Sequence, residues 1–388
     1  MTTPAVVSSA THQKQIPCSR HGVTKISNMI WQYMMVAVLA WSPLQAADSV
    51  TKLSSDESVT LFPAMGWRNP AGAGWLIEFH GWVYEQEPRR ISVAVLQNLL
   101  ELKLEDLSAE EQRYFKERSR WFLVDNERKK NLIASLDGMT MDLGETESDG
   151  HVEKLIAVAN PTNRKQKLNE GTHAVTLKLA AKDARKIQGA VHLVGEEGWT
   201  VLSDIDDTIK VTEVRNKDAL VRNTFCRAFQ PAEGMAKVYA EWAAQGAVFH
   251  YVSASPWQLY PDLEAFRAAH GYPAGTFHLR KMRLKDQSGV EFLIGSGDFK
   301  PKEIGSLLER FPKRRFVLVG DSGEHDPEVY GELARKHPKQ VTRVLIRNVT
   351  GESEDVERYR TAFQGLAREK WAIFKHPSEV KQLGPLKE

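Results

Sequence analysis

Acidic and hydroxyl side chains follow three apolar runs in the C-terminal half, at the point where each run ends. The first run closes with residues 203–208 (Ser-Asp-Ile-Asp-Asp-Thr) and the second with residues 253–256 (Ser-Ala-Ser-Pro). The third closes with residues 320–326 (Gly-Asp-Ser-Gly-Glu-His-Asp). Carboxylates in such a setting can hold a divalent cation, act as nucleophiles and transfer protons, so this pattern indicates catalysis rather than a solvated turn.

Asp204 and Asp206 are two residues apart at the end of an apolar run. Strand alternation puts both side chains on one side, where neighbouring like charges cannot both stay fully ionised without a cation. Mg²⁺ prefers a few carboxylates together with waters and phosphate oxygens. We expect its ligands to be Asp204, Asp321, Asp326 and a main-chain oxygen of Asp206. A calcium loop is the alternative, but its sixth position needs Gly and here is Ile209.

The elements that must position these acids alternate in type after residue 198. Short buried strands between helices of about ten residues predict an α/β fold, a Rossmann-like parallel sheet covered on both faces. Ligands of such a sheet bind beyond the carboxyl ends of the strands, where the acids lie. We expect strands at 199–205, 247–252, 316–319 and 341–346, helices at 234–245, 303–310 and 328–336, and closing helices within 352–374.

The preceding half has a hydrophobic period of two, which is typical of strands. It is clearest at residues 75–84 and 174–179. Ser108 and Glu111 form a possible capping box before a helix, and a second strand pair is expected at 121–124 and 131–136. The sequence therefore predicts an N-terminal β-rich, sandwich-like domain with a helical insertion at 48–195 and an α/β domain at 198–376.

A possible export signal precedes both domains. The first 28 residues carry Lys14, Arg20 and Lys25 and no acid, and an apolar run follows that ends in small residues. This predicts a signal peptide over residues 1–46, cut near Ala46, and hence a periplasmic or secreted protein. The alternative is an uncleaved leader that anchors the chain to a membrane.

Composition bounds the function further. A chain of 388 residues with 42% hydrophobic and 26% charged residues is long enough for two or three folded domains. Its 52 basic and 50 acidic residues become 49 and 50 without the leader, so no global charge favours nucleic acid. Cys18 lies in the leader, which leaves Cys226 without a partner for a disulfide, and we assign Cys226 no function.

Four motifs follow one another along the chain: the acid motif at 203–208, the strand that ends in Ser253, Lys300 before a helix, and the acid motif at 320–326. In this order they resemble the four motifs of the haloacid dehalogenase superfamily. Residues 203–208, 249–260 and 316–326 resemble more closely the actin-patch-associated phosphatidate phosphatase family, over about residues 199–350. The resemblance implies a haloacid dehalogenase-like fold and a Mg²⁺-dependent phosphatase that releases diacylglycerol and phosphate from phosphatidate.

Each motif residue then has an expected role. Asp204 attacks phosphorus and forms an aspartyl-phosphate, while Asp206 protonates the leaving oxygen and later activates water. Lys300 neutralises the phosphoryl charge and orients Asp204, with Lys302 as the alternative lysine. The Ser253 hydroxyl and helix-start amides from Ala254 onward hold phosphate oxygens, and Thr208 braces the loop.

Several alternatives stay open from the sequence. The substrate could be a soluble phosphomonoester, or the β-rich domain could carry the function by binding a surface or partner. The segment from 208 to 247 is too short for a large cap, so we expect an open site. An aromatic segment at 257–260 either contacts a membrane or packs within the fold, and Arg222 and Asn223 either contact substrate or lie on a surface helix.

Overall fold

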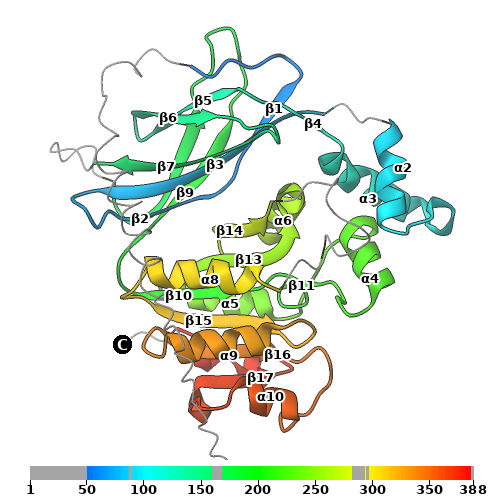
Figure 1. Ribbon diagram of the computed structural model, residues 1–388, viewed down its shortest axis with the longest axis vertical. Coiled ribbons are helices and arrows are strands. Elements are labelled where there is room, and N and C mark those ends of the chain that lie inside the picture. Colours follow the sequence, from blue (N-terminus) through cyan, green and yellow to red (C-terminus); the bar gives the residue numbers. More distant parts are fainter. Residues whose placement is uncertain (1–49, 87–89, 160–167, 282–292, 294–296, 386–388) are drawn as a thin grey trace, which may run out of the picture. The chain divides into compact units, whose positions relative to one another are not determined.

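The structure is a computed structural model that describes residues 50–86, 90–159, 168–281, 293 and 297–385. These residues belong to one compact unit of the chain. The predicted signal peptide lies outside the described residues. Two sheets carry the fold, one on each side of residue 195 (Figure 1).

The first sheet has nine strands. Seven of them follow the order β1-β3-β2-β9-β8-β5-β6, and both β4 and β7 pair with β3. The long strand β3 shows the predicted alternation only in its middle, where Ile77 and Phe79 are buried and Glu78 is exposed. Towards both ends the other face is buried too, at Leu76 and Trp82. The strands are β1 (Glu57–Leu61), β2 (Ala64–Arg68), β3 (Trp75–Glu85), β4 (Asp125–Asn126), β5 (Asn131–Leu136), β6 (Met139–Glu145), β7 (His151–Val158), β8 (Gly171–Leu177) and β9 (Gln188–Val194).

A helical insertion separates β3 from β4, as the sequence predicts. It contains α2 (Arg90–Leu99), η1 (Leu104–Asp106), α3 (Ala109–Ser119) and η2 (Arg120–Phe122). The capping box forms, because Ser108 accepts from the Glu111 amide and Glu111 accepts from the Ser108 amide. The strand expected at 121–124 is wrong. The chain turns there as η2, which lets Trp121 and Phe122 bury their rings in a core shared with the second sheet.

The second sheet is entirely parallel and confirms the predicted α/β class. Its order is β14-β13-β10-β15-β16-β17. The strands are β10 (Trp199–Ser203), β13 (Val248–Pro256), β14 (Gly275–Arg280), β15 (Arg315–Asp321), β16 (Val341–Arg347) and β17 (Trp371–Phe374). Strand β14 was not predicted from the sequence. Helices alone were predicted for residues 352–374, whereas β17 lies there as a last parallel strand beside β16.

Helices cover both faces of this sheet (Figure 1). Successive strand residues alternate between two cores: Val201 packs with the residues of α5 and α6, and Leu202 packs with those of α8, α9 and α10. The helices are α5 (Met235–Ala244), α6 (Tyr260–Ala269), α8 (Phe299–Arg310), α9 (Asp326–Lys336) and α10 (Glu357–Ala362). The division of the chain into two domains at about residue 196 stays a prediction.

A short excursion follows β10. It consists of β11 (Lys210–Val211), which pairs with β12 (Gln230–Pro231), and between them α4 (Lys217–Val221) and a π-helical turn, η4 (Arg222–Cys226). This excursion and the carboxyl ends of β10, β13 and β15 surround the acids picked out from the sequence.

Candidate active site

Three acids meet at the carboxyl edge of the parallel sheet. Asp204 follows β10, Asp321 ends β15 and Asp326 begins α9. The pairing of β10 with β15 brings the first two together, and the Asp204 amide donates to the Val319 carbonyl at 2.8 Å. One oxygen from each carboxylate lies within 4.8 Å of the others, and all three side chains are fully buried.

This three-acid cluster has the properties of a cation site. Among the described residues, Oδ2 of Asp204 and Oδ2 of Asp321 have no hydrogen-bond partner, while Oδ1 of Asp204 is ion-paired with Lys300. Burial, reinforced by the neighbouring carboxylates, raises the pKa of both groups well above the usual range of a carboxyl. Buried, unpaired carboxylate oxygens are costly unless a cation compensates them. The all-oxygen donor set fits a hard divalent ion such as Mg²⁺.

Lys300 supplies the positive charge of the cluster. Its Nζ lies 2.8 Å from Oδ1 of Asp204, 2.7 Å from Oδ1 of Asp326 and 2.7 Å from Oε2 of Glu324. Burial would lower the pKa of this ammonium, but the surrounding carboxylates prevail and raise it well above its usual range. Lys302 is exposed on the same helix, so the structure places Lys300 rather than Lys302 at the acids.

Asp206 lies apart from the three-acid cluster, within four donors. Lys210 contacts its Oδ1 at 2.7 Å and Thr212 donates to Oδ1 at 2.8 Å, while Ser253 and Ser255 donate to Oδ2 at 3.0 and 3.1 Å. Burial would raise the pKa of Asp206, but the Lys210 charge and these hydrogen bonds lower it to about 2. Ser253, expected to bind phosphate, thus holds Asp206 in this structure.

The other expected phosphate and loop contacts differ in detail. Ala254 is buried inside β13, and the next amide, that of Ser255, donates to the Ser253 hydroxyl at 3.0 Å. Strand β13 runs on to Pro256, and the short helix η5 (Trp257–Leu259) and α6 begin only after it, so no helix start follows Ser253 directly. Thr208 is buried, and its hydroxyl has no hydrogen-bond partner among the described residues.

Asp207, rather than Thr208, stabilises the loop after β10. The sequence analysis assigned Asp207 no role. Its φ of 56° is in the left-handed region. Its carboxylate accepts the amides of Thr212, Glu213 and Val214, each at 2.8 Å. Short acidic side chains tolerate this backbone region and bond to nearby amides, so the doubled Asp after Ile205 was the available signal.

The remaining candidates make structural contacts. Arg222 pairs with Asp218 and Glu111, and Asn223 donates to the Thr212 carbonyl. The aromatic segment at 257–260 is buried, with the Trp257 ring 4.5 Å from that of Phe62, so packing explains it. Two further polar groups are buried away from the acids. His250 is hydrogen-bonded to Thr276, and Cys226 is a free cysteine whose thiol pKa is raised by burial to about 12.

The expectation of an open site is wrong for this structure. Asp204, Asp321 and Asp326 have no exposed surface, and Asp206 is 8% exposed. A small gap beside them is lined by Asp206, Val214, Leu220, Thr224, Ser255, Leu293 and Glu324. The excursion after β10 is therefore short but still closes over the acids.

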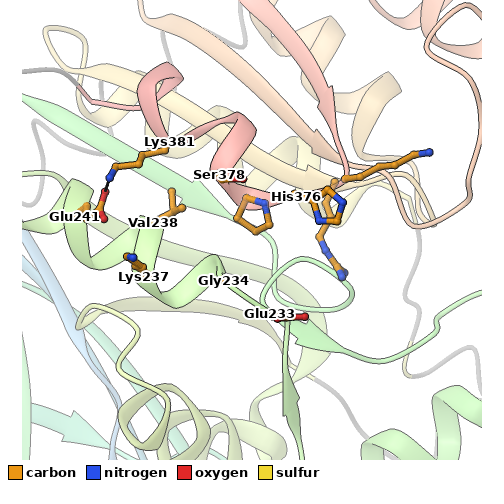
Figure 2. A pocket seen from close by; sticks show the side chains of 11 residues that line it. Glu233, Gly234, Lys237, Val238, Glu241, His376, Ser378 and Lys381 are labelled. Atoms are coloured by element: carbon orange, nitrogen blue, oxygen red, sulfur yellow. Dashed lines mark ion pairs between the residues drawn. The ribbon is translucent and has the colours of Figure 1, made fainter.

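A larger cavity of about 650 Å³ lies elsewhere, between the start of α5 and the C-terminal segment (Figure 2). The ion pair of Lys381 with Glu241, at 2.8 Å, lies along it. None of the three clustered acids lines this cavity. Its link to the loop after β10 is Arg347, which donates to the Asp207 carbonyl at 2.6 Å. It is separate from the candidate active site.

A parallel α/β sheet with buried acids at the carboxyl ends of neighbouring strands, and a lysine beside them, is typical of the haloacid dehalogenase-like class. Residues 199–348 match the family model described as phosphatidate phosphatase APP1, catalytic domain. This match supports the resemblance to that family that the motifs indicated, and with it the prediction of a phosphatase-type catalytic domain.

Two curated yeast proteins are similar to part of this chain. Phosphatidate phosphatase APP1 of Saccharomyces cerevisiae is 36% identical over 170 residues, which cover 42% of this chain and 28% of that protein. An uncharacterised protein of Schizosaccharomyces pombe is 29% identical over 183 residues, or 45% of this chain and 30% of that protein. The chain thus matches less than a third of the length of these relatives.

A solved structure of phosphoserine phosphatase in apo form also aligns. It covers 48% of this chain and 98% of the solved chain at 12% identity. Its TM-score of 0.31 is too low to support an argument about this protein.

The comparisons correct the expectation of a periplasmic protein with a signal peptide. The proteins that this chain resembles are phosphatidate phosphatase APP1 of S. cerevisiae and a second yeast protein, and we drop the periplasmic assignment in favour of that resemblance. Among the described residues, none of the helices has the length and apolar character needed to cross a bilayer. Secretion, or anchorage by an uncleaved leader, stays a prediction.

Proposed function

We propose that this chain is a phosphomonoester hydrolase that works through a phosphorylated Asp204, with phosphatidate as its substrate. The observation that carries the proposal is the state of Asp204, a fully buried carboxylate whose Oδ1 lies 2.8 Å from Lys300 Nζ and whose Oδ2 has no hydrogen-bond partner among the described residues. A nucleophilic carboxylate must keep an oxygen free for attack, and a fixed ammonium beside it stabilises the charge that develops on the phosphoryl group.

The chain's own residues then divide the chemistry. An oxygen of Asp204 bonds to phosphorus as the bond to the leaving alcohol oxygen breaks. Asp206 passes a proton from the bound phosphate monoanion to that oxygen, then takes one from the water that hydrolyses the acyl phosphate and releases it to solvent as phosphate leaves. Because Lys210 keeps Asp206 ionised, the first proton must arrive with the substrate, as on a phosphate monoanion. Lys300 pairs with the phosphoryl oxygens throughout.

A divalent cation fits the three-acid cluster, and we propose Mg²⁺. When bound, it would neutralise the phosphate charge and act as a Lewis acid. Asp204 and Asp321 would hold it through their Oδ2 atoms, together with Asp326 and the main-chain oxygen of Asp206. In a titration followed by calorimetry, Asp321→Asn should weaken Mg²⁺ binding at least about tenfold, since it removes a ligand charge. Unchanged affinity would contradict the assignment.

The lipid substrate is supported by the similarity to yeast phosphatidate phosphatase APP1, 36% identical in the matched part. A soluble phosphomonoester is the second candidate. The β-rich part at 48–195 is proposed as a separate domain, and a role for it in binding a surface or partner is the third candidate.

A substrate panel separates these candidates. The protein is incubated with Mg²⁺ and either phosphatidate in detergent micelles or soluble phosphomonoesters, and released phosphate is measured. We expect hydrolysis of phosphatidate, complete loss with Asp204→Asn, and no loss with the exposed control Asp355→Asn. Hydrolysis of soluble esters alone would favour the second candidate, and no hydrolysis by the wild type would overturn the proposal.

A further inference from the structure

The helical segment formed by α4 and η4, residues 217–226, lies beside the small gap next to Asp206, and we call it the cover segment. Leu220 and Thr224 of this segment line the small gap next to Asp206 and Ser255. Any substrate whose phosphorus reaches Asp204 must extend past these side chains, because Asp204 itself has no exposed surface. The position of the cover segment therefore determines how much space is available for the group that the phosphate carries.

A helix of the preceding half holds this segment in place. Arg118 of α3 donates through Nη1 to the carbonyls of Thr224 at 2.8 Å and Arg227 at 2.6 Å. Its side chain is only 5% exposed. Glu111, also on α3, pairs with Arg222 at 3.4 Å and with Arg227 at 3.1 Å.

The segment that Arg118 contacts is a π-helical turn, η4. Such turns are rare, depart from the regular helical ladder and occur frequently at functional sites. A buried guanidinium is costly unless partners compensate it; here Nη1 donates to main-chain carbonyls of the turn and of the residue that follows it, and Nε lies 3.8 Å from the Asp262 carboxylate. Arg118 thus fixes the backbone of the cover segment rather than one of its side chains.

We propose that Arg118 is a positioning residue that acts through the cover segment to set which phosphoesters the site accepts. The inference rests on the proposed phosphatase function. The α3 insertion becomes part of the catalytic unit, although it precedes the matched catalytic region by about eighty residues. Leu220 and Thr224 contact the group carried by the phosphate, so a bulky ester depends on Arg118 more than a compact one does.

The test compares two substrates in the full chain, phosphatidate in micelles and p-nitrophenyl phosphate. Replacing Arg118 with Met should raise KM for phosphatidate at least about tenfold, the equivalent of losing one hydrogen bond to a charged group. The kcat for p-nitrophenyl phosphate should change less than about twofold. Arg118→Lys, which keeps a cationic donor, should restore part of the phosphatidate KM.

Control variants keep the result interpretable. Arg113→Met, on the exposed face of the same helix, should leave both substrates unaffected. Glu111→Gln, which weakens the same attachment at a less buried position, should shift the phosphatidate KM in the same direction if Arg118→Met does not fold. Equal loss of both activities in Glu111→Gln, or no change in either variant, would overturn this inference. A wild type inactive on both substrates would instead overturn the proposed function.

Discussion

The ammonium group of Lys210 lies 2.7 Å from Oδ1 of Asp206, and both side chains are buried. The pair is completed by Thr212, which donates to the same carboxylate, and by the ring of Phe229, whose centroid lies 4.9 Å from Lys210 Nζ. Lys210 therefore compensates the charge of an acid that would otherwise be costly to bury. It also keeps Asp206 ionised.

Removing Lys210 should destabilise the fold. Breaking a buried ion pair leaves an uncompensated charge, and Lys210→Met should lower the free energy of unfolding by about 3–5 kcal/mol at neutral pH. Urea denaturation followed by circular dichroism measures this. Lys237→Met, at an exposed position of α5, is the matched control and should stay within about 0.5 kcal/mol. Equal stability of the two variants would show that the pair contributes little.

The two lysines at the start of α8 should differ sharply. Lys300 is buried among three carboxylates, whereas Lys302 is exposed. Lys300→Met should reduce phosphate release by at least about 10²-fold, as expected for loss of a preorganised charge at the phosphoryl group. Lys302→Met should retain wild-type turnover. The assay is the Mg²⁺-dependent release of phosphate, and a larger loss with Lys302→Met would reverse the assignment.

Gly320 should be needed for the geometry of Asp326. A Cβ at this position would collide with Oδ2 of Asp326 and with the Tyr330 ring. Gly320→Ala should therefore displace the carboxylate and lower both activity and stability. Gly305→Ala, where nothing lies within 4 Å of the added Cβ, should stabilise α8 by about 0.5–1 kcal/mol. Thermal unfolding and phosphate release of the two variants measure the contrast, and an active Gly320→Ala enzyme would contradict it.

Acid should unfold the β-rich part through a pair of buried histidines. His80 Nε2 and His151 Nδ1 are 2.8 Å apart. Burial lowers the pKa of His151 from its ordinary 6.5 to about 4 and that of His80 well below 6.5. Both histidines are neutral when folded but protonate in the unfolded chain, so stability present above pH 6.5 is lost as pH falls toward 4.

The expected slope is up to about 1.4 kcal/mol per pH unit for each proton taken up on unfolding. Denaturant titrations at several pH values measure it. His151→Gln should reduce the slope, and His270→Gln, which changes an exposed side chain, should not. A slope of zero between pH 6.5 and 4 in the wild type would contradict the linkage.

The sequence predicted the parallel sheet well where strands are apolar runs that end in polar motifs, as at β10, β13 and β15. It missed β14, because polar residues interrupt Gly275–Arg280, and β17, because the four residues Trp371–Phe374 are too short to show a period. Their strand character comes from pairing with β13 and β16. Tertiary context, rather than local preference, determines such short strands.

The acids of the candidate site could be predicted from the sequence, but only some of the residues that contact them could. Asp204, Asp321, Asp326 and Lys300 belong to spaced motifs, so their meeting could be anticipated from the strand order. Lys210 could not, since a lysine after the motif is usually exposed and only the fold shows that it is buried against Asp206. Arg118 is more distant still, because its partners lie about a hundred residues further along the chain.

The most direct test is to find the phosphoryl group on the protein. Enzyme is mixed with ³²P-labelled phosphatidate and Mg²⁺, quenched in acid within milliseconds, digested and mapped by mass spectrometry. The account predicts a transient label on the peptide that contains Asp204, sensitive to hydroxylamine and absent from Asp204→Asn. Turnover with no labelled peptide, or with the label on another residue, would contradict it.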